Sequence, residues 1–315
     1  MTLPFALHLA VEDALGVTIR DARPLSGGMI NQAAYLSTSD GLLFLKWKHN
    51  APLGFFEAEA RGLELLRGAE ALRVPSVVAW HDAPPLHEGA LSHPADEAPP
   101  SWLALEWLEG ATVHDEDAFA RDFAEGLAAQ HRVTAAQHGD AKGRGNFLGE
   151  FAQDNTPHDS WAEFWRDCRL MPLLERGLRD GLLSPAYRDL LLRVVDHSAT
   201  LFDQCDTRPA LLHGDLWSGN YLPIEDDNGK TLCALVDPAA YFGSREMELA
   251  YIELFGGFPQ NFMACYHTAY PLNAGYERRR PLLQIYPLLV HYLHFGAEYG
   301  PPLERACSAA LNWRA

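Results

Sequence analysis

Positive charge is scarce in this sequence. Its 315 residues include 25 Lys and Arg against 42 Asp and Glu, which gives a formal net charge of −17 at pH 7. No run of Lys or Arg is long enough to form a basic stripe, so we expect neither a nucleic-acid partner nor an anionic membrane surface. A substrate that carries phosphate must then be neutralised by a bound cation and a few local basic side chains, which favours Mg²⁺.

Paired cysteines and long apolar segments are also missing. The five cysteines include no C-x-x-C pair, so the sequence indicates neither a zinc site nor a disulfide framework. The first residues, MTLPFALHLAVEDALG, lack a cationic segment followed by an uninterrupted apolar one, and no later segment has the apolar length of a membrane span. We therefore expect a cytoplasmic protein with an amphipathic first helix and no membrane partner.

The remaining composition is that of an ordinary globular protein, with 48% hydrophobic and 21% charged residues. Residues 23–48 alternate turn and strand signals, and the pair Asp40-Gly41 predicts a hairpin turn between two strands. The proline-rich segment 84–100 is expected to be a surface loop. Periodicity predicts the other elements of this part, a helix over 55–72 and strands over 77–80 and 102–107.

From residue 108 onward the pattern becomes mainly helical. Apolar residues recur at helical spacing in five stretches, near 117–132, 159–178, 184–204, 245–255 and 280–297. Asn228-Gly229 is the exception, because Asn-Gly between two short apolar runs predicts a hairpin. We therefore predict an α+β protein with two lobes: a small antiparallel sheet with one main helix over 1–107, and a larger, mainly helical lobe over 108–315 that carries this hairpin.

The segment His213-Gly214-Asp215-Leu216-Trp217-Ser218-Gly219-Asn220 has the spacing of a kinase catalytic loop. In such loops the Asp accepts the proton of the attacking hydroxyl, and an Asn five positions later binds a metal through its amide oxygen. Four fixed positions are more specific than an Asp and an Asn alone. We assign Asp215 as the catalytic base and Asn220 as a metal ligand; the alternative interpretation is an Asx turn between two strands.

Asp237 follows the predicted strand Leu232 to Val236 and is the second expected metal ligand. If the two strands form the hairpin, its carboxylate emerges beside the catalytic loop. There it has the role of the kinase aspartate that binds Mg²⁺ and bridges the β- and γ-phosphates of ATP. By itself, Asp-Pro is also a common turn.

A kinase site also needs a Lys on a strand and a Glu on the next helix, an ion pair that holds the α- and β-phosphates. Lys46 and Lys48 share one strand face, so periodicity cannot choose between them. Lys46 follows the apolar run directly and is preferred. Glu59 lies on the apolar side of the predicted helix, where a carboxylate needs a buried partner, whereas Glu57 lies on the polar side. The alternative for Glu59 is a residue at the margin of the apolar stripe.

Three further features are weaker. Gly27 and Gly28 would let main-chain N–H groups approach the phosphates, although a plain turn explains them equally well. The stretch from Glu106 to Leu108 is where a hinge would offer main-chain groups to adenine. Trp217 would form an apolar platform for a sugar ring, or it is a core anchor.

Three other polar residues are expected to be structural. His131 ends the apolar stripe of its helix, so we expect it to pack beneath the catalytic loop. Arg245 and Glu246 begin a helix beyond Asp237, where they form a local pair or brace the metal-binding loop.

At this point the sequence resembles a known family. LLHGDLWSGN and VDPAAYFGSRE resemble the fructosamine kinase (ketosamine-3-kinase) family, whose relatives include aminoglycoside phosphotransferases and choline kinases. The resemblance runs through nearly the whole chain, including the GG pair, the FLK strand, FEAEA, NFLG at 146–149 and YPLLVHYLHFGAEY. It implies a protein-kinase-like fold and ATP-dependent phosphorylation of the 3-hydroxyl of a ketosamine, the rearranged adduct of a sugar with an amine. In that family the 3-phosphate falls apart, so the amine is regenerated and glycation is repaired.

Two positions depart from the family pattern. Met29 stands where several members have a polar residue or cysteine, and Glu248 stands where Asp is usual. The alternatives that remain are a kinase of the same fold that acts on an aminoglycoside or amino alcohol, and a kinase-shaped binding protein without turnover. The sequence leaves open whether the ketosamine is free or attached to a protein, and it does not fix the oligomeric state.

Overall fold

The computed structural model describes residues 3–25, 31–84, 99–202 and 208–312. The chain divides into two compact units, each described here by itself. The first unit consists of Met1–Val113 together with Leu222–Asp237, and the second consists of His114–Tyr221 together with Pro238–Ala315. The division differs from the expected boundary at 107/108, and it groups the later hairpin with the first unit.

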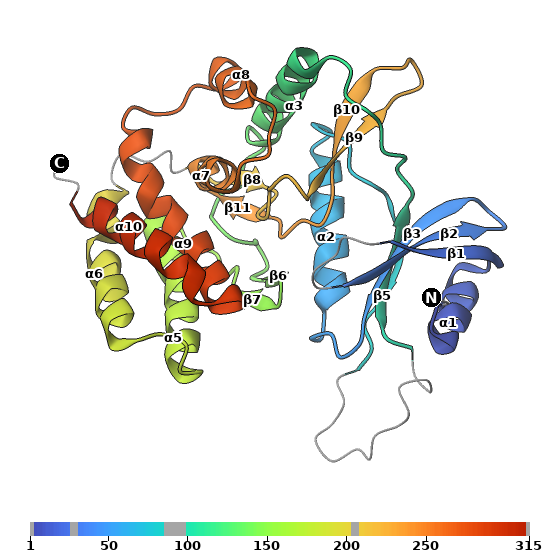
Figure 1. Cartoon of the computed structure of the whole chain (residues 1–315), viewed down its shortest axis with the longest axis horizontal. Helices are drawn as coiled ribbons and strands as arrows, with labels where there is room; N and C mark the ends of the chain where they lie inside the picture. The colour runs from blue at the N-terminus through green and yellow to red at the C-terminus, as the bar shows by residue number, and fades with distance from the viewer. Residues whose placement is uncertain (1–2, 26–30, 85–98, 203–207, 313–315) are drawn as a thin grey trace. The chain divides into compact units, whose positions relative to one another are not determined.

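The first unit is built on a five-stranded antiparallel sheet in the order β1-β2-β3-β5-β4 (Figure 1). Its elements are α1 (Phe5–Leu15), β1 (Ile19–Leu25), β2 (Gln32–Thr38), β3 (Leu42–Lys48), α2 (Phe55–Gly68), β4 (Val77–His81) and β5 (Ser101–Glu106). The hairpin predicted at Asp40-Gly41 joins β2 to β3. Strand β1 was not predicted, because IRDARPL alternates charged residues with few β-branched or aromatic ones.

Alternation along β3 decides what each face of the sheet carries. Leu45 and Trp47 point to one face, where they form a core with Leu7 and Val11 of α1. Lys46 lies between them in sequence and therefore points to the opposite face. Helix α2 covers that face, because Glu59 of α2 contacts Lys46. The sheet thus buries a lysine, which demands a charged partner.

The later hairpin, predicted from Asn228-Gly229, consists of β9 (Tyr221–Glu225) and β10 (Thr231–Leu235). Gly229, in the turn between the two strands, has a positive φ of 76°. Main-chain hydrogen bonds attach this hairpin to the first unit. Leu235 N donates to Arg73 O at 2.8 Å, and Ala111 N donates to Pro223 O at 2.8 Å. These bonds join segments that are more than a hundred residues apart, which is why sequence pattern placed the hairpin in the other lobe.

The second unit is mainly helical. Its helices are α3 (Glu116–Gln130), α4 (Trp161–Trp165), the π-helical turn η1 (Arg166–Leu170), α5 (Met171–Arg179), α6 (Pro185–Leu201), α7 (Arg245–Phe255), α8 (Phe262–Ala269), α9 (Tyr276–Phe295), η2 (Ala297–Tyr299) and α10 (Gly300–Leu311). Its short strands pair as β6 (Asn146–Leu148) with β7 (Phe151–Gln153), and β8 (Ala210–Leu212) with β11 (Tyr241–Gly243). The five predicted helical stretches are present, whereas α8, α10 and these short strands were missed.

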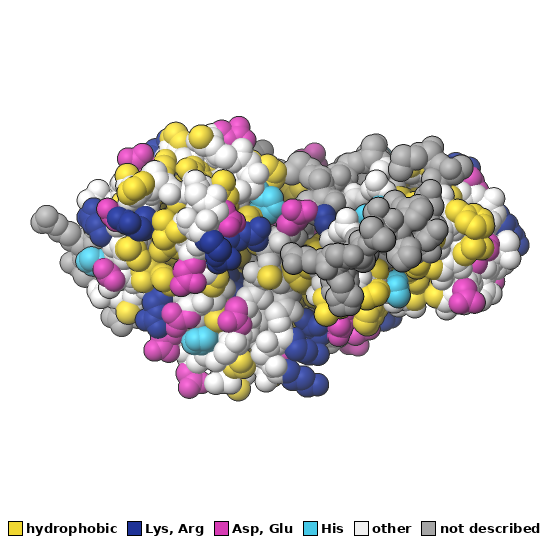
Figure 2. Space-filling view, turned by 90° about the horizontal axis from the view of Figure 1, so that it is seen from below, with side chains coloured by type: hydrophobic (Ala, Val, Ile, Leu, Met, Phe, Trp, Pro, Cys, Tyr) yellow, Lys and Arg dark blue, Asp and Glu magenta, His cyan; other side chains and the backbone are white. Residues whose placement is uncertain are grey.

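Two surface findings bear on the expected partners. Among the described residues, no helix is both long enough and apolar enough to span a membrane. On the face seen in Figure 2, basic side chains are scattered among acidic, apolar and neutral ones. The absence of nucleic-acid and membrane partners and the cytoplasmic location remain predictions.

Candidate active site

The segment after β8 forms a tight loop that requires glycine at its second position. Gly214 has a φ of 84°, and a Cβ added there would lie 2.1 Å from Ala239 O. His213 O accepts a hydrogen bond from Ala239 N at 3.0 Å, so the loop is fastened to the chain just after residue 237. Any other residue at 214 would push this loop away from its support.

Asp215 and Asn220 come together as their spacing predicted. Asn220 Nδ2 donates to Asp215 Oδ2 at 3.0 Å and to Asp215 O at 2.8 Å. The turn between them is closed by a bond from Asn220 N to Trp217 O at 2.9 Å. With Nδ2 bound to Asp215, Oδ1 is the atom through which Asn220 would bind a metal.

A buried carboxylate supports the loop from below. Glu248 accepts from Gly214 N at 2.7 Å and from His213 N at 3.2 Å, and it contacts His131 Nε2 at 2.9 Å. His131 Nδ1 in turn lies 2.8 Å from the hydroxyl of Tyr266. Burial opposes the ionised form of Glu248, but the bonds to His131 and the loop amides outweigh it and hold the pKa of this carboxyl below its ordinary value. His131 therefore lies beneath the catalytic loop, as predicted.

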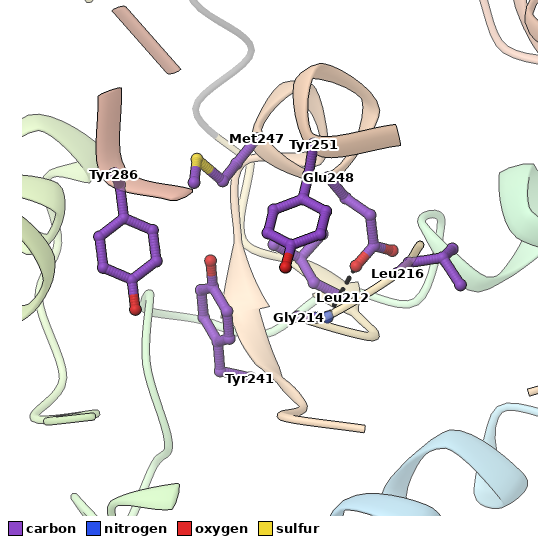
Figure 3. Close-up of a pocket in the computed structure, with 8 residues that line it drawn as sticks. All are labelled: Leu212, Gly214, Leu216, Tyr241, Met247, Glu248, Tyr251 and Tyr286. Carbon is purple, nitrogen blue, oxygen red and sulfur yellow. Dashed lines mark hydrogen bonds between the residues drawn. The ribbon is translucent and has the colours of Figure 1, made fainter. Parts of the chain in front are cut away.

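A small pocket lies beside this loop (Figure 3). Its walls are Leu212, Gly214, Leu216, Tyr241, Met247, Glu248, Tyr251 and Tyr286. The rings of Tyr241, Tyr251 and Tyr286 stand around it (Figure 3). Tyr251 makes the contact that sequence reasoning missed, because its hydroxyl donates to Asp215 Oδ1 at 2.6 Å.

The first unit brings Lys46, Glu59 and Asp237 together. Lys46 is 2% exposed, and its Nζ contacts the Glu59 carboxylate and, at 2.9 Å, Asp237 Oδ1. The structure thus places Lys46, and not Lys48, between the two carboxylates. Asp237 has a φ of 54°, a left-handed conformation that non-glycine residues seldom adopt and that often marks a functional site.

The charges of this cluster are unequal, because one ammonium faces two carboxylates. The two carboxylates together outweigh the burial of Lys46 and raise its pKa, so the lysine stays charged. For Glu59, burial is the larger effect and raises the pKa to about 7, against the opposing influence of Lys46. Glu59 therefore takes up a proton more readily than an ordinary glutamate does.

The role of Glu106 to Leu108 as a hinge that binds adenine stays a prediction. The Glu106 main-chain N–H is already used, because it donates to Ser76 O at 2.9 Å, and its carboxylate binds the Arg73 guanidinium and accepts from Ser76 N at 3.0 Å. Leu108 lies just beyond the end of β5. Gly27, Gly28 and Met29 fall outside the described residues, so the role predicted for the two glycines stays a prediction.

Trp217 is not a core anchor, because it is 40% exposed. Its ring lies close to Gly219, where an added Cβ would come within 2.3 Å of the ring. Gly219 therefore allows the indole to fold back over the loop while one part of the ring remains open to solvent.

Arg245 and Glu246 both have partners on distant segments of the second unit. The Arg245 guanidinium donates to Tyr270 O at 2.9 Å and to Pro271 O at 2.6 Å. Glu246 pairs with Arg279 of α9 through two bonds, at 2.7 and 2.8 Å, and both side chains are fully buried. Residues 245–252 of α7 are all buried, so charged side chains at these positions must have partners inside the protein. The sequence does not indicate which residues those partners are.

Comparison with solved structures defines the class of protein. The chain matches an aminoglycoside phosphotransferase with a TM-score of 0.64 at 16% identity, over 97% of each chain, which shows a common fold. It matches a candidate fructosamine-3-kinase from Thermobifida fusca with a TM-score of 0.81 at 32% identity, over 98% of this chain and 99% of the other. The protein is a phosphotransferase of the protein-kinase-like fold.

The family follows from sequence. Residues 5–312 match the model of the family described as fructosamine kinase. A probable ketoamine kinase of Synechocystis is 35% identical over 298 residues, 93% of this chain and 91% of that protein. A chloroplastic protein-ribulosamine 3-kinase of Arabidopsis thaliana is 31% identical over 87% of this chain and 78% of that protein. The chain belongs to the fructosamine kinase family, as its motifs predicted, and its α+β kinase-like fold is confirmed.

Proposed function

We propose that this chain transfers the γ-phosphoryl group of ATP to the 3-hydroxyl of a ketosamine, with Asp215 as the general base. Membership of a kinase family supports the use of ATP and the substrate class. The observation that carries the assignment of the base is the pair of bonds from Asn220 Nδ2 to Asp215, because it brings together the Asp and the Asn of a loop with kinase spacing.

Asp215 accepts the proton of the 3-hydroxyl as that oxygen forms its bond to phosphorus and the bond to the ADP oxygen breaks. Little covalent chemistry is asked of the protein in such a transfer, so its main task is to position the acceptor. The loop is suited to this task, since Glu248 binds its main chain and Asn220 donates a hydrogen bond to the side chain of Asp215.

Mg²⁺ fits the oxygen donors that the chain offers. Asn220 would bind it through Oδ1 and Asp237 through its half-exposed carboxylate, and such a cation supplies positive charge to the phosphates. Within the described residues, no group of three or more His, Cys, Asp or Glu side chains is placed so that it could hold a metal ion by itself. Lys46, held by Glu59, would bind the α- and β-phosphates.

The exposed face of Trp217 is suited to packing against the sugar part of the substrate. The acceptor is a glycated amine, either a free metabolite or a residue on a protein. The 3-phosphate of such a compound is expected to break down and release the amine, so the reaction would remove glycation.

Phosphorus NMR of purified protein with ATP, Mg²⁺ and either fructosyl-lysine or ribulosyl-lysine tests this proposal. The expected result is a new phosphomonoester at O3, followed by release of lysine. Kanamycin and choline serve as control acceptors of the two related enzyme classes. Product with a control acceptor and none with either ketosamine would overturn the assignment of the substrate.

A further inference from the structure

The carboxylate of Asp215 is bound from two directions. Tyr251 O–H donates to Oδ1 at 2.6 Å, whereas Asn220 Nδ2 donates to Oδ2 at 3.0 Å. Tyr251 belongs to α7, is 5% exposed, and packs against Phe255 with ring centroids 4.8 Å apart. Each oxygen of this one carboxylate thus meets a donor from a different part of the second unit.

We propose that Tyr251 is a positioning residue that fixes the orientation of the Asp215 carboxylate, an inference that rests on the proposed role of Asp215 as base. One donor alone leaves an aspartate free to turn about its Cβ–Cγ bond, because that torsion is broad and nearly two-fold. A second donor on the other oxygen fixes the plane of the carboxylate. An O–H bond to a carboxylate at this distance is charge-assisted and among the stronger hydrogen bonds in proteins.

Helix α7 holds the loop at two levels. Glu248 precedes Tyr251 by three residues, so both side chains lie on one face of the helix. Glu248 binds the main chain of the loop at His213 and Gly214, and Tyr251 binds the side chain of Asp215. Figure 3 shows both side chains reaching from α7 toward the loop. One rigid element therefore sets both the position of the loop and the direction of its carboxylate.

The phenol of Tyr251 remains a donor throughout the working pH range. Burial and, next, the negative charge of Asp215 raise the pKa of Tyr251 well above its ordinary value. The other titratable groups that influence it are Tyr286 of α9 and Tyr299 of η2, which are also phenols. Tyr251 is therefore suited to orienting a carboxylate and unsuited to accepting the substrate proton itself.

The test is the variant Tyr251→Phe, which removes the hydroxyl and keeps the ring. We expect kcat to fall about 10- to 100-fold, as for the loss of a hydrogen bond to a charged group, while KM for ATP and the melting temperature stay close to the wild type. A lower kcat with an unchanged KM for ATP would indicate a positioning role, because loss of a merely structural hydroxyl would not lower kcat selectively.

Tyr276→Phe is the matched control. Tyr276 is also buried, and its hydroxyl also donates to a carboxylate of α7, that of Glu253. We expect its kcat to match the wild type. Equal losses of kcat in Tyr251→Phe and Tyr276→Phe would overturn the proposal, because the effect would then come from loss of any buried hydroxyl.

Asp215→Asn, measured beside them, separates the two claims. An inactive Asp215→Asn with a fully active Tyr251→Phe would overturn the positioning role and leave Asp215 as the base. A fully active Asp215→Asn would overturn both. Loss of kcat in Asp215→Asn and in Tyr251→Phe, with Tyr276→Phe unchanged, is the result that the structure predicts.

Discussion

Truncation of Glu248 should destabilise the second unit and disable the catalytic loop together. The side chain is buried and accepts hydrogen bonds from His213 N and Gly214 N. It also contacts His131 Nε2, which must be the donor because an ionised carboxylate can only accept. Glu248→Ala leaves these three donors without their acceptor. At about 1–3 kcal/mol for each buried group, reduced by water that enters the vacated space, the free energy of unfolding should fall by about 3–5 kcal/mol. That is a large part of the stability of an ordinary domain.

Glu248→Gln should cost less, about 1–2 kcal/mol, because an amide oxygen still accepts while the charge is lost. The pKa of Glu248 lies below its ordinary value of 4.5. A lowered pKa contributes stability above the ordinary value, and this contribution disappears as the pH falls through the pKa of the folded state. The difference in stability between wild type and Glu248→Gln should therefore shrink below pH 4.5.

Urea unfolding followed by tryptophan fluorescence measures both variants, with kcat determined on the same samples. Glu277→Gln is the control: its exposed pair with Arg280 should contribute no more than about 1 kcal/mol. If Glu248→Ala changed the free energy of unfolding no more than Glu277→Gln, the carboxylate would not be the support of the loop, and the reasoning would fail.

Three further predictions concern other parts of the molecule. Lys46→Ala should raise KM for ATP about 10- to 100-fold, as loss of a charged hydrogen bond does, with KM for the ketosamine unchanged in steady-state kinetics. Arg279→Met should lower the free energy of unfolding by about 3–5 kcal/mol, because it leaves the Glu246 carboxylate buried without its cation. Arg280→Met, which is partly exposed, should cost less than about 1 kcal/mol in the same urea titration. Trp217→Ala should raise KM for the ketosamine about 2- to 10-fold without lowering the melting temperature.

The parts of the site that sequence predicted are those encoded within short segments. Asp215 and Asn220 are five residues apart, and one turn brings them together. The strand pattern indicates that Lys46 is buried, and the helix pattern separately indicates that Glu59 is buried. The two residues could therefore be predicted as a pair. Periodicity could not separate Lys46 from Lys48; that choice needed the position of α2 against the sheet.

The parts that were missed depend on contacts between distant segments. Tyr251 is 36 residues from Asp215, and Glu246 is 33 residues from Arg279. In each case the helical pattern indicates burial, but not which partner the polar group meets. The Glu106 carboxylate also has a distant partner, since it binds Arg73, 33 residues earlier.

Steady-state kinetics of Asp215→Asn, combined with calorimetric titration of ATP, tests the central claim most directly. Loss of a positioned base should lower kcat with a ketosamine about 10²- to 10⁴-fold and leave the Kd for ATP within about twofold, since the base acts only in the reacting complex. An unchanged kcat, or a collapse of ATP affinity in a folded variant, would contradict the assignment of Asp215 as the catalytic base.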